Sequence, residues 1–284
     1  MINKTDAHLH SWDLEKIQYS WLNKEAGILY NNYTPEKIEN ELLSVGVTSA
    51  VLVQADNSIV DSTYMFEQAA LFPWIKGVVA WLPLEEPDQV IKVIEDDYGS
   101  NPFFKGVRHL MHVEPDPKWI LQEKVLTSLQ ILAEKKIPFD AIGINLQQLD
   151  AIIIMAEKIP QLKIMIDHLN QPPLGDEKKS AEWRALMTEA ANSPNLFAKI
   201  SGLTTLSNSG SLDFHDQLSS IIEFTVERFG ADRCCCGSDW PISLLKTTYQ
   251  DTWELYEKIL TSIDGKASTT HMILESTAKF FYHI

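Results

Sequence analysis

Two histidines and an aspartate stand at alternate positions near the start of the chain, in the stretch Asp6-Ala7-His8-Leu9-His10. Side chains two residues apart on a β-strand point to the same face, so we expect these three to share one face. Two imidazoles projecting together at a strand end can bind a divalent metal ion or donate hydrogen bonds to an oxyanion. The alternative is a pair of hydrogen-bonded histidines buried in the core.

Two later segments place a titratable residue directly after an apolar run, His168 near residues 163–169 and Asp239 near residues 233–240. In a barrel of parallel strands the carboxyl ends converge on one site, so residues far apart in sequence can meet. The converging set is then His8, His10, His168 and Asp239. Three imidazoles and one carboxylate suffice for a mononuclear zinc-type site, or for a base with electrophiles and no metal.

The elements that must position these residues are short apolar runs that alternate with charged segments of helical spacing. Eight strands are predicted, at residues 5–10, 48–55, 75–84, 104–111, 138–144, 163–169, 196–203 and 233–240. Strands separated by helices pair in parallel, and eight such units in a chain of this length are typical of an α/β fold, the (β/α)₈ TIM barrel. A doubly wound open sheet is disfavoured, because no G-x-G-x-x-G turn follows an early strand. We expect one domain over residues 1–284.

Composition narrows the partners of this barrel. The 284 residues include 24 Lys and Arg against 39 Asp and Glu, a formal net charge of −15. A nucleic-acid backbone or an anionic membrane would be repelled by most of such a surface, so neither is expected as a partner. With 45% hydrophobic and 22% charged residues the chain has the composition of a globular protein, and a small molecule is the expected ligand.

The three cysteines, Cys234, Cys235 and Cys236, are consecutive. Adjacent cysteines do not form a disulfide framework, so we expect a reducing compartment and thiols packed in a buried strand. The first residues lack the apolar stretch of a secretory signal, and no apolar run approaches the roughly 20 residues of a membrane span. Together these features predict a cytoplasmic protein.

Eight segments of the chain, in order, resemble the amidohydrolase superfamily, within it the branch of sugar-lactone hydrolases that includes L-fuconolactonase and L-rhamnonolactonase. They are DAHLHSWD (6–13), YSWL (19–22), GVTSAVLVQA (46–55), GVVAWLPL (77–84), FKGVRHLMHVEPDPKW (104–119), IDHLNQPP (166–173), AKISGL (198–203) and GSDWPIS (237–243). The resemblance implies a metal-dependent-hydrolase-like barrel. It also implies that His8, His10, His168 and Asp239 are the metal ligands, for one divalent ion, zinc first, or that the site works without a metal.

Arg108 matches a site arginine that would hold a substrate carboxylate or polarise the carbonyl. Alternation puts Arg108 and His109 on opposite faces of their strand, and we favour Arg108 inward because Val107 and Met111 then pack outward. Substrate contacts are expected from Trp21, Gln54, Trp81, His109 and His112, where aromatic faces cover a sugar and polar groups bind its hydroxyls. Lys199 ends a strand, where a lysine is usually solvated.

The chain departs from the superfamily pattern in two places. Binuclear members carry a bridging lysine or glutamate on the fourth strand and a histidine on the fifth; the fourth strand here offers Lys105 and Arg108, and residues 138–144 hold no histidine. Two metals are therefore not expected. In addition, Asn170-Gln171-Pro172 stands where relatives commonly carry Gly-Lys-Pro.

These residues lead to a specific hypothesis, the opening of a sugar-acid lactone such as L-fucono- or L-rhamnonolactone. Asp239 would take a proton from water as general base and return it to the leaving oxygen, with His168 and Arg108 as further catalytic residues. Asp6 would orient an imidazole from behind. Two alternatives stay open: hydrolysis of an aromatic-derived lactone or a decarboxylation on the same barrel, or a barrel that binds a sugar acid without catalysis.

Overall fold

Eight strands form one parallel sheet in the order β1 to β8, each paired with the next along the chain. The computed structural model describes residues 3–206 and 214–284. The strands are β1 (Lys4–Leu9), β2 (Val47–Val53), β3 (Ile75–Ala80), β4 (Phe104–His109), β5 (Phe139–Ala141), β6 (Ile164–Ile166), β7 (Leu196–Ile200) and β8 (Cys234–Cys236). The expected eight strands and the α/β barrel are thereby confirmed.

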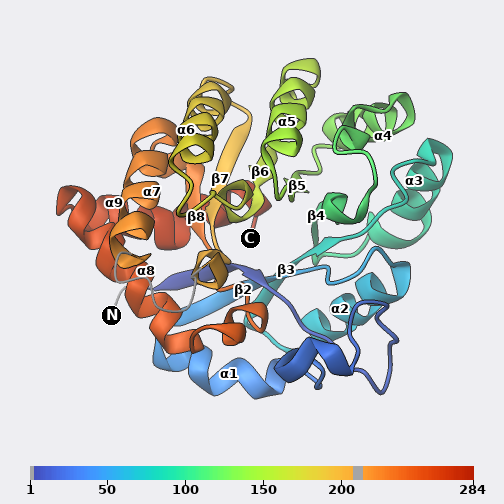
Figure 1. Ribbon diagram of the computed structural model, residues 1–284. Helices are drawn as coiled ribbons and strands as arrows, with labels where there is room; N and C mark the ends of the chain where they lie inside the picture. Colours follow the sequence, from blue (N-terminus) through green and yellow to red (C-terminus); the bar gives the residue numbers. More distant parts are fainter. Residues whose placement is uncertain (1–2, 207–213) are drawn as a thin grey trace.

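Helices surround the strands as an outer ring (Figure 1). They are α1 (Pro35–Ser44), α2 (Ile59–Leu71), α3 (Pro87–Val93), α4 (Glu123–Glu134), α5 (Leu146–Lys158), α6 (Glu177–Ala191), α7 (Phe214–Phe229), α8 (Tyr249–Asp264) and α9 (Ala267–His271). A further helix, α10 (Thr277–Tyr282), packs instead against the apolar residues inside the barrel. Local sequence fixes where several begin: the side chains of Ser58 and Asn145 accept backbone N–H groups of the first turns of α2 and α5, and α1 opens with Pro35.

Shorter helical turns fill many of the connections. The 3₁₀ turns are η1 (Lys24–Leu29), η3 (Met111–Val113), η4 (Trp119–Leu121), η5 (Asp167–Asn170), η6 (Leu203–Leu206), η7 (Ala231–Arg233) and η8 (Ile242–Leu245), and the π turns are η2 (Ile94–Tyr98) and η9 (Met272–Ser276). Among the described residues no helix combines the length and the apolar character needed to cross a bilayer.

Among the described residues the core forms three apolar clusters. One packs the loop after β1 against α2 and includes Trp12 and Tyr64, and the sheet separates the other two. The larger one lies between the strands and the outer helices and includes Ala50 and Leu52 of β2. The smaller one fills the barrel and includes Val51 and Val53 of the same strand, together with Tyr282 of α10. Because both faces of each strand are buried, the strands are continuous apolar runs, as the sequence indicated.

The barrel closes between β1 and β8 at their carboxyl ends. Leu9 forms a parallel bridge with Trp240, and the amide of His10 donates to the carbonyl of Trp240 at 2.7 Å. Next to it, the amide of Asp239 donates to the carbonyl of His8 at 2.8 Å. Closure of the barrel therefore brings His8 and His10, at the end of β1, next to Asp239, which follows β8.

Candidate active site

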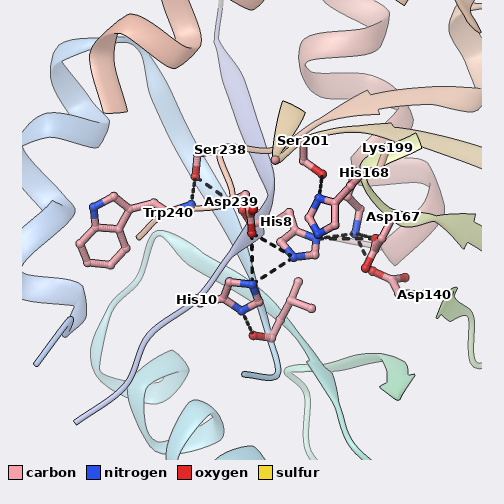
Figure 2. Close-up of polar contacts among 12 residues, drawn as sticks. His8, His10, Asp140, Asp167, His168, Lys199, Ser201, Ser238, Asp239 and Trp240 are labelled. Carbon is pink, nitrogen blue, oxygen red and sulfur yellow. Dashed lines mark hydrogen bonds and ion pairs between the residues drawn. The ribbon is translucent and has the colours of Figure 1, made fainter. Parts of the chain in front are cut away.

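The seam between β1 and β8 carries two imidazoles and a carboxylate in contact. Nε2 of His10 lies 3.3 Å from Oδ1 of Asp239, and Nε2 of His8 lies 3.7 Å from the same oxygen. The two Nε2 atoms are 3.2 Å apart. Figure 2 shows His8 between two groups: His10 and Asp239 on one side, and Asp167, His168 and Lys199 on the other.

Asp6 does not share the face of His8 and His10, contrary to the expectation from simple alternation. The β1–β2 register shifts between Asp6 and Leu9, so three residue steps on β1 oppose two on β2, as in a β-bulge. The bulge turns Asp6 toward the outer helices, where its carboxylate accepts hydrogen bonds from the Tyr249 hydroxyl (3.0 Å) and the Ser238 amide (2.9 Å). Asp6 thus ties β1 to the β8 loop through the amide of Ser238 and does not contact an imidazole ring.

Arg108 points into the barrel, as expected from the sequence, and its guanidinium group contacts both His8 and Asp167. Its Nη1 atom lies 3.2 Å from Nε2 of His8 and 3.1 Å from Oδ2 of Asp167, and its Nη2 donates to the carbonyl of Gln54 at 2.7 Å. An arginine that is only 2% exposed requires such partners. Its charge is therefore matched by Asp167 inside the barrel.

Lys199 is fully buried, so the expectation of a solvated strand-end lysine is wrong. Its ammonium group lies 2.6 Å from Asp140, 2.8 Å from Asp167 and 3.2 Å from Nδ1 of His8. Burial alone would lower the pKa of Lys199, but the two carboxylates raise it. In Asp167 the cations and His8 outweigh burial and hold the pKa well below its usual value, so both groups stay charged.

The contacts of Asp140 and Asp167 with Lys199 and Arg108 form a charged network beneath His8, which the sequence did not reveal. Arg108 was already expected to point inward. Asp140, Asp167 and Lys199 are charged residues within an apolar strand or directly after one, and that position is the only signal in the sequence that could have marked them. Strand pairing alone does not tell which of these side chains meet.

His168 reaches the site through a left-handed turn that follows β6. His168, Leu169, Asn170 and Gln171 have φ values of 52°, 50°, 54° and 47°. This conformation costs about 1–2 kcal/mol per residue and persists only where surrounding contacts hold it. The holding contacts include the Ser201 hydroxyl, 2.9 Å from Nδ1 of His168, and the Trp183 indole, which donates to the carbonyl of Leu169 at 2.9 Å.

The imidazoles of His8, His112 and His168 are uncharged at neutral pH. Burial lowers the pKa of His168, and it lowers that of His8 well below the usual value despite Asp167. Burial, followed by the charge of Arg108, lowers the pKa of His112 to about 4. Neutral imidazoles can ligate a metal ion or take part in hydrogen bonds as both donor and acceptor.

A cavity of about 610 Å³ opens above these groups at the carboxyl ends of the strands. His10, Arg108, His168 and Asp239 line it, and so do two of the expected substrate contacts, Trp21 and His112. Asp56 and Asn57, which follow β2, also line it, although the sequence did not single them out.

The other three expected substrate contacts lie behind the cavity wall. Gln54 is fully buried, and its side chain donates toward Asn57 (3.3 Å) and the Arg108 carbonyl (3.4 Å). The His109 ring stacks on Trp119, and its Nε2 atom lies 3.2 Å from Nδ2 of Asn57. The Trp81 indole donates to Nδ1 of His109 at 3.1 Å. These residues support the wall and do not form its surface.

Within the described part of the chain, two sets of nitrogen and oxygen ligands lie close enough to hold a divalent ion. His8, His10 and Asp239 form one, and His8, Asp167 and His168 form the other, with ligand atoms within 4.8 Å of one another in each. The expected four-residue set is thus divided, with His8 common to both halves. Nδ1 of His10 lies 2.7 Å from the Val53 carbonyl, which can only accept a hydrogen bond. The imidazole proton is therefore on Nδ1, and the unprotonated Nε2 has a lone pair for a metal ion. The first set therefore has the donor chemistry that zinc takes.

Known proteins resemble this chain over nearly its whole length. The L-fucono-1,5-lactonase of Burkholderia ambifaria is 28% identical over 251 residues, which cover 88% of this chain and 84% of that protein. The L-rhamnono-gamma-lactonase of Scheffersomyces stipitis is 22% identical, over 98% of both chains. A crystal structure of an amidohydrolase from Burkholderia multivorans with bound zinc has a TM-score of 0.90 and 22% identity, covering 99% of each chain.

The family assignment itself comes from a broader match. The family model described as amidohydrolase matches residues 5–284, which include both strands of the barrel seam and every residue of the site. The barrel, the paired histidines of β1 and the aspartate after β8 are the parts of the structure that this match spans. The chain therefore belongs to the amidohydrolase family, and it is a hydrolase that acts on a small molecule.

Proposed function

We propose that this hydrolase opens the lactone of a sugar acid, an aldonolactone such as L-fucono- or L-rhamnonolactone, with Asp239 as general base. The observation that carries the proposal is the placement of the Asp239 carboxylate on the cavity wall, 3.3 Å from His10 and beside Arg108 and His168. The names of the two lactonase relatives support the substrate class.

Asp239 would act on the attacking water. The backbone amide of Asp239 donates to the His8 carbonyl at 2.8 Å, so its carboxylate is held beside the two histidines while it accepts a proton from water. The same carboxyl group would then protonate the ring oxygen as the C–O bond of the lactone breaks. One residue thereby serves both halves of the proton transfer.

Arg108 and His168 would stabilise the negative charge that develops on the carbonyl oxygen. Both line the cavity with Asp239, and both are held before substrate arrives, Arg108 by Asp167 and His168 by Ser201. When the Ser201 hydroxyl donates to Nδ1, the proton of neutral His168 sits on Nε2 and can be donated to the substrate. Donors fixed in advance stabilise a transition state without further reorganisation.

One divalent ion, zinc by the ligand types, would be held by His8, His10 and Asp239 and would supply Lewis-acid polarisation of the carbonyl when bound. His168 belongs to the other ligand set and is proposed as a hydrogen-bond donor. Trp21 and His112 would contact the sugar ring, and Gln54, Trp81 and His109 would hold the wall behind them.

A screen of uncharged aldonolactones with a pH indicator tests this function, because ring opening releases an acid. We expect acid release with six- or five-membered aldonolactones, and release slower by roughly 10² or more with the Asp239→Asn protein. Release of carbon dioxide from a hydroxybenzoate would identify a decarboxylase instead. Tight binding of an aldonate with no turnover of any lactone would favour a sugar-acid-binding barrel.

A further inference from the structure

The segment that follows β2 forms part of the cavity wall and has a fixed backbone. Oδ2 of Asp61 accepts the amides of Ala55 (2.9 Å) and Asp56 (3.4 Å), and the Trp21 indole donates to the carbonyl of Ala55 at 2.9 Å. Asp56 lines the cavity in this segment. Its backbone is therefore held from two sides, on the same cavity as Asp239.

The Asp56 carboxylate has unused hydrogen-bonding capacity. Among residues 3–206 and 214–284 no other side chain forms a hydrogen bond or an ion pair with it, and its one partner is the backbone amide of Asn57. Asp56 is partly buried, and burial raises its pKa. A partly desolvated carboxylate with free lone pairs gains most from a ligand that donates hydrogen bonds.

Asp56 adds a negative charge to the cavity wall, and no lysine or arginine among the described residues forms an ion pair with it. Arg108 is the only lysine or arginine among the described residues that line the cavity, and Asp167 lies 3.1 Å from that guanidinium group. Asp56 and Asp239 are the two carboxylates among the described residues of the lining, and Asp239 belongs to the proposed metal ligands. With the proposed ion on His8, His10 and Asp239, Asp56 remains the one carboxylate of the described lining without a cation, and a ligand carboxylate beside it would meet like-charge repulsion.

We propose that Asp56 determines specificity by charge: it accepts hydrogen bonds from hydroxyl groups of an uncharged polyhydroxy lactone and repels ligands that carry a carboxylate. The inference rests on the proposed function and adds to it the residue that selects the substrate class. It also has a consequence for the product, since opening the ring creates a carboxylate within the same cavity. The Asp56 carboxylate that binds the hydroxyl groups of the neutral lactone thus repels the acid formed from it.

Calorimetric titration tests this inference without turnover. The ligands are a six-membered aldonolactam, in which a ring N–H replaces the ring oxygen, the open-chain aldonate, and 2-pyrone-4,6-dicarboxylate. The proteins are the wild type, Asp56→Asn and Glu15→Gln. Glu15 is an exposed acid in the loop after β1 and outside the cavity lining, so its variant makes the same change in net charge.

We expect the wild type and Glu15→Gln to bind the lactam more tightly than either anion. Asp56→Asn should weaken lactam binding roughly tenfold, the scale of a lost charge-assisted hydrogen bond, and should strengthen binding of both anions at least about threefold. An unchanged lactam affinity in Asp56→Asn, or a wild type that binds aldonate as tightly as lactam, would overturn the inference.

The outcome separates this inference from the proposed function. If the lactam binds, the anions are excluded through Asp56, and yet no lactone is hydrolysed, the charge selection stands and the lactonase proposal fails. If lactones are hydrolysed while Asp56→Asn keeps the KM and the anion affinities of the wild type, the lactonase proposal stands and the role of Asp56 is wrong.

Discussion

Gly202 packs against His168 so closely that a Cβ atom on the glycine would lie 2.7 Å from Nδ1 of the imidazole. The same atom would lie 2.8 Å from Oδ2 of Asp239. Gly202 follows β7 with φ +64°. The absence of a side chain permits this left-handed backbone conformation and leaves room for His168 and Asp239. The loop after β7 therefore fixes the distance between the two groups that line the reacting end of the cavity.

Gly202→Ala should lower kcat/KM for the lactone at least about tenfold, because the added methyl group displaces His168 or Asp239 from its position. The matched control is Gly265→Ala, where φ is +65° and nothing lies within 4 Å of the added atom. Both variants lose about 1–2 kcal/mol of unfolding free energy through the left-handed backbone. Equal activity of the two variants would show that Gly202 has no role in the site.

Asp239→Asn should lower kcat for lactone opening by roughly 10² or more, since the amide cannot accept the proton of water. Steady-state kinetics measure the change, and circular dichroism confirms that the variant is folded. A variant with near wild-type kcat would remove Asp239 from the role of general base.

Zinc analysis of the purified protein should give about one ion per chain, and His10→Ala should lose it. His112→Ala is the control, because His112 lines the cavity but belongs to neither ligand set. Chelation should lower turnover, and added zinc should restore it. Full turnover in protein verified to be free of metal would assign carbonyl polarisation to Arg108 and His168 alone.

Lys199→Met should lower the unfolding free energy by about 3–5 kcal/mol, because Asp140 and Asp167 then remain buried with one cation fewer. Lys178→Met is the control: that side chain is 89% exposed, and its pairing with Glu182 spans 4.0 Å. The control should stay within about 0.5 kcal/mol of the wild type in urea unfolding. Similar losses in both variants would mean that the buried network contributes no more than a surface pair.

Asp61 should make stability depend on pH. Burial raises its pKa from 3.8 to about 7, so the folded state binds a proton that the unfolded state releases. The unfolding free energy contributed by this group is present below pH 4 and falls as pH rises to 7, by up to about 4 kcal/mol. In urea unfolding, the unfolding free energy of Asp61→Asn relative to that of the wild type should therefore be higher at pH 8 than at pH 5.5. A constant difference between the two proteins would contradict this assignment.

The convergence of His8, His10, His168 and Asp239 could be predicted because it depends only on parallel strands. Each residue stands at the carboxyl end of a recognisable apolar run, and those ends meet at one face of a barrel. The inward direction of Arg108 followed from alternation and from its apolar neighbours. These are local patterns combined with one rule of topology.

The parts that could not be predicted depend on contacts between distant strands. A register shift between β1 and β2 moves Asp6 to the outer face, and no pattern within β1 signals it. Lys199 of β7 is buried because its ammonium group meets Asp140 of β5, two strands away, and Asp167, which directly follows the neighbouring strand β6. Only the folded barrel brings these three residues together. The left-handed turn at His168 likewise needs the distant Ser201 to hold it.

The charged network inside the barrel is completed by the element that follows all eight strands. The Tyr282 hydroxyl of α10 donates to Asp140 at 2.6 Å, and Tyr282 packs among the apolar residues within the barrel. During synthesis on the ribosome, α10 emerges after every strand that contributes to the site. A nascent chain that already contains all its catalytic residues therefore still lacks Tyr282 beneath them. Its active site reaches its final form only once α10 has left the exit tunnel.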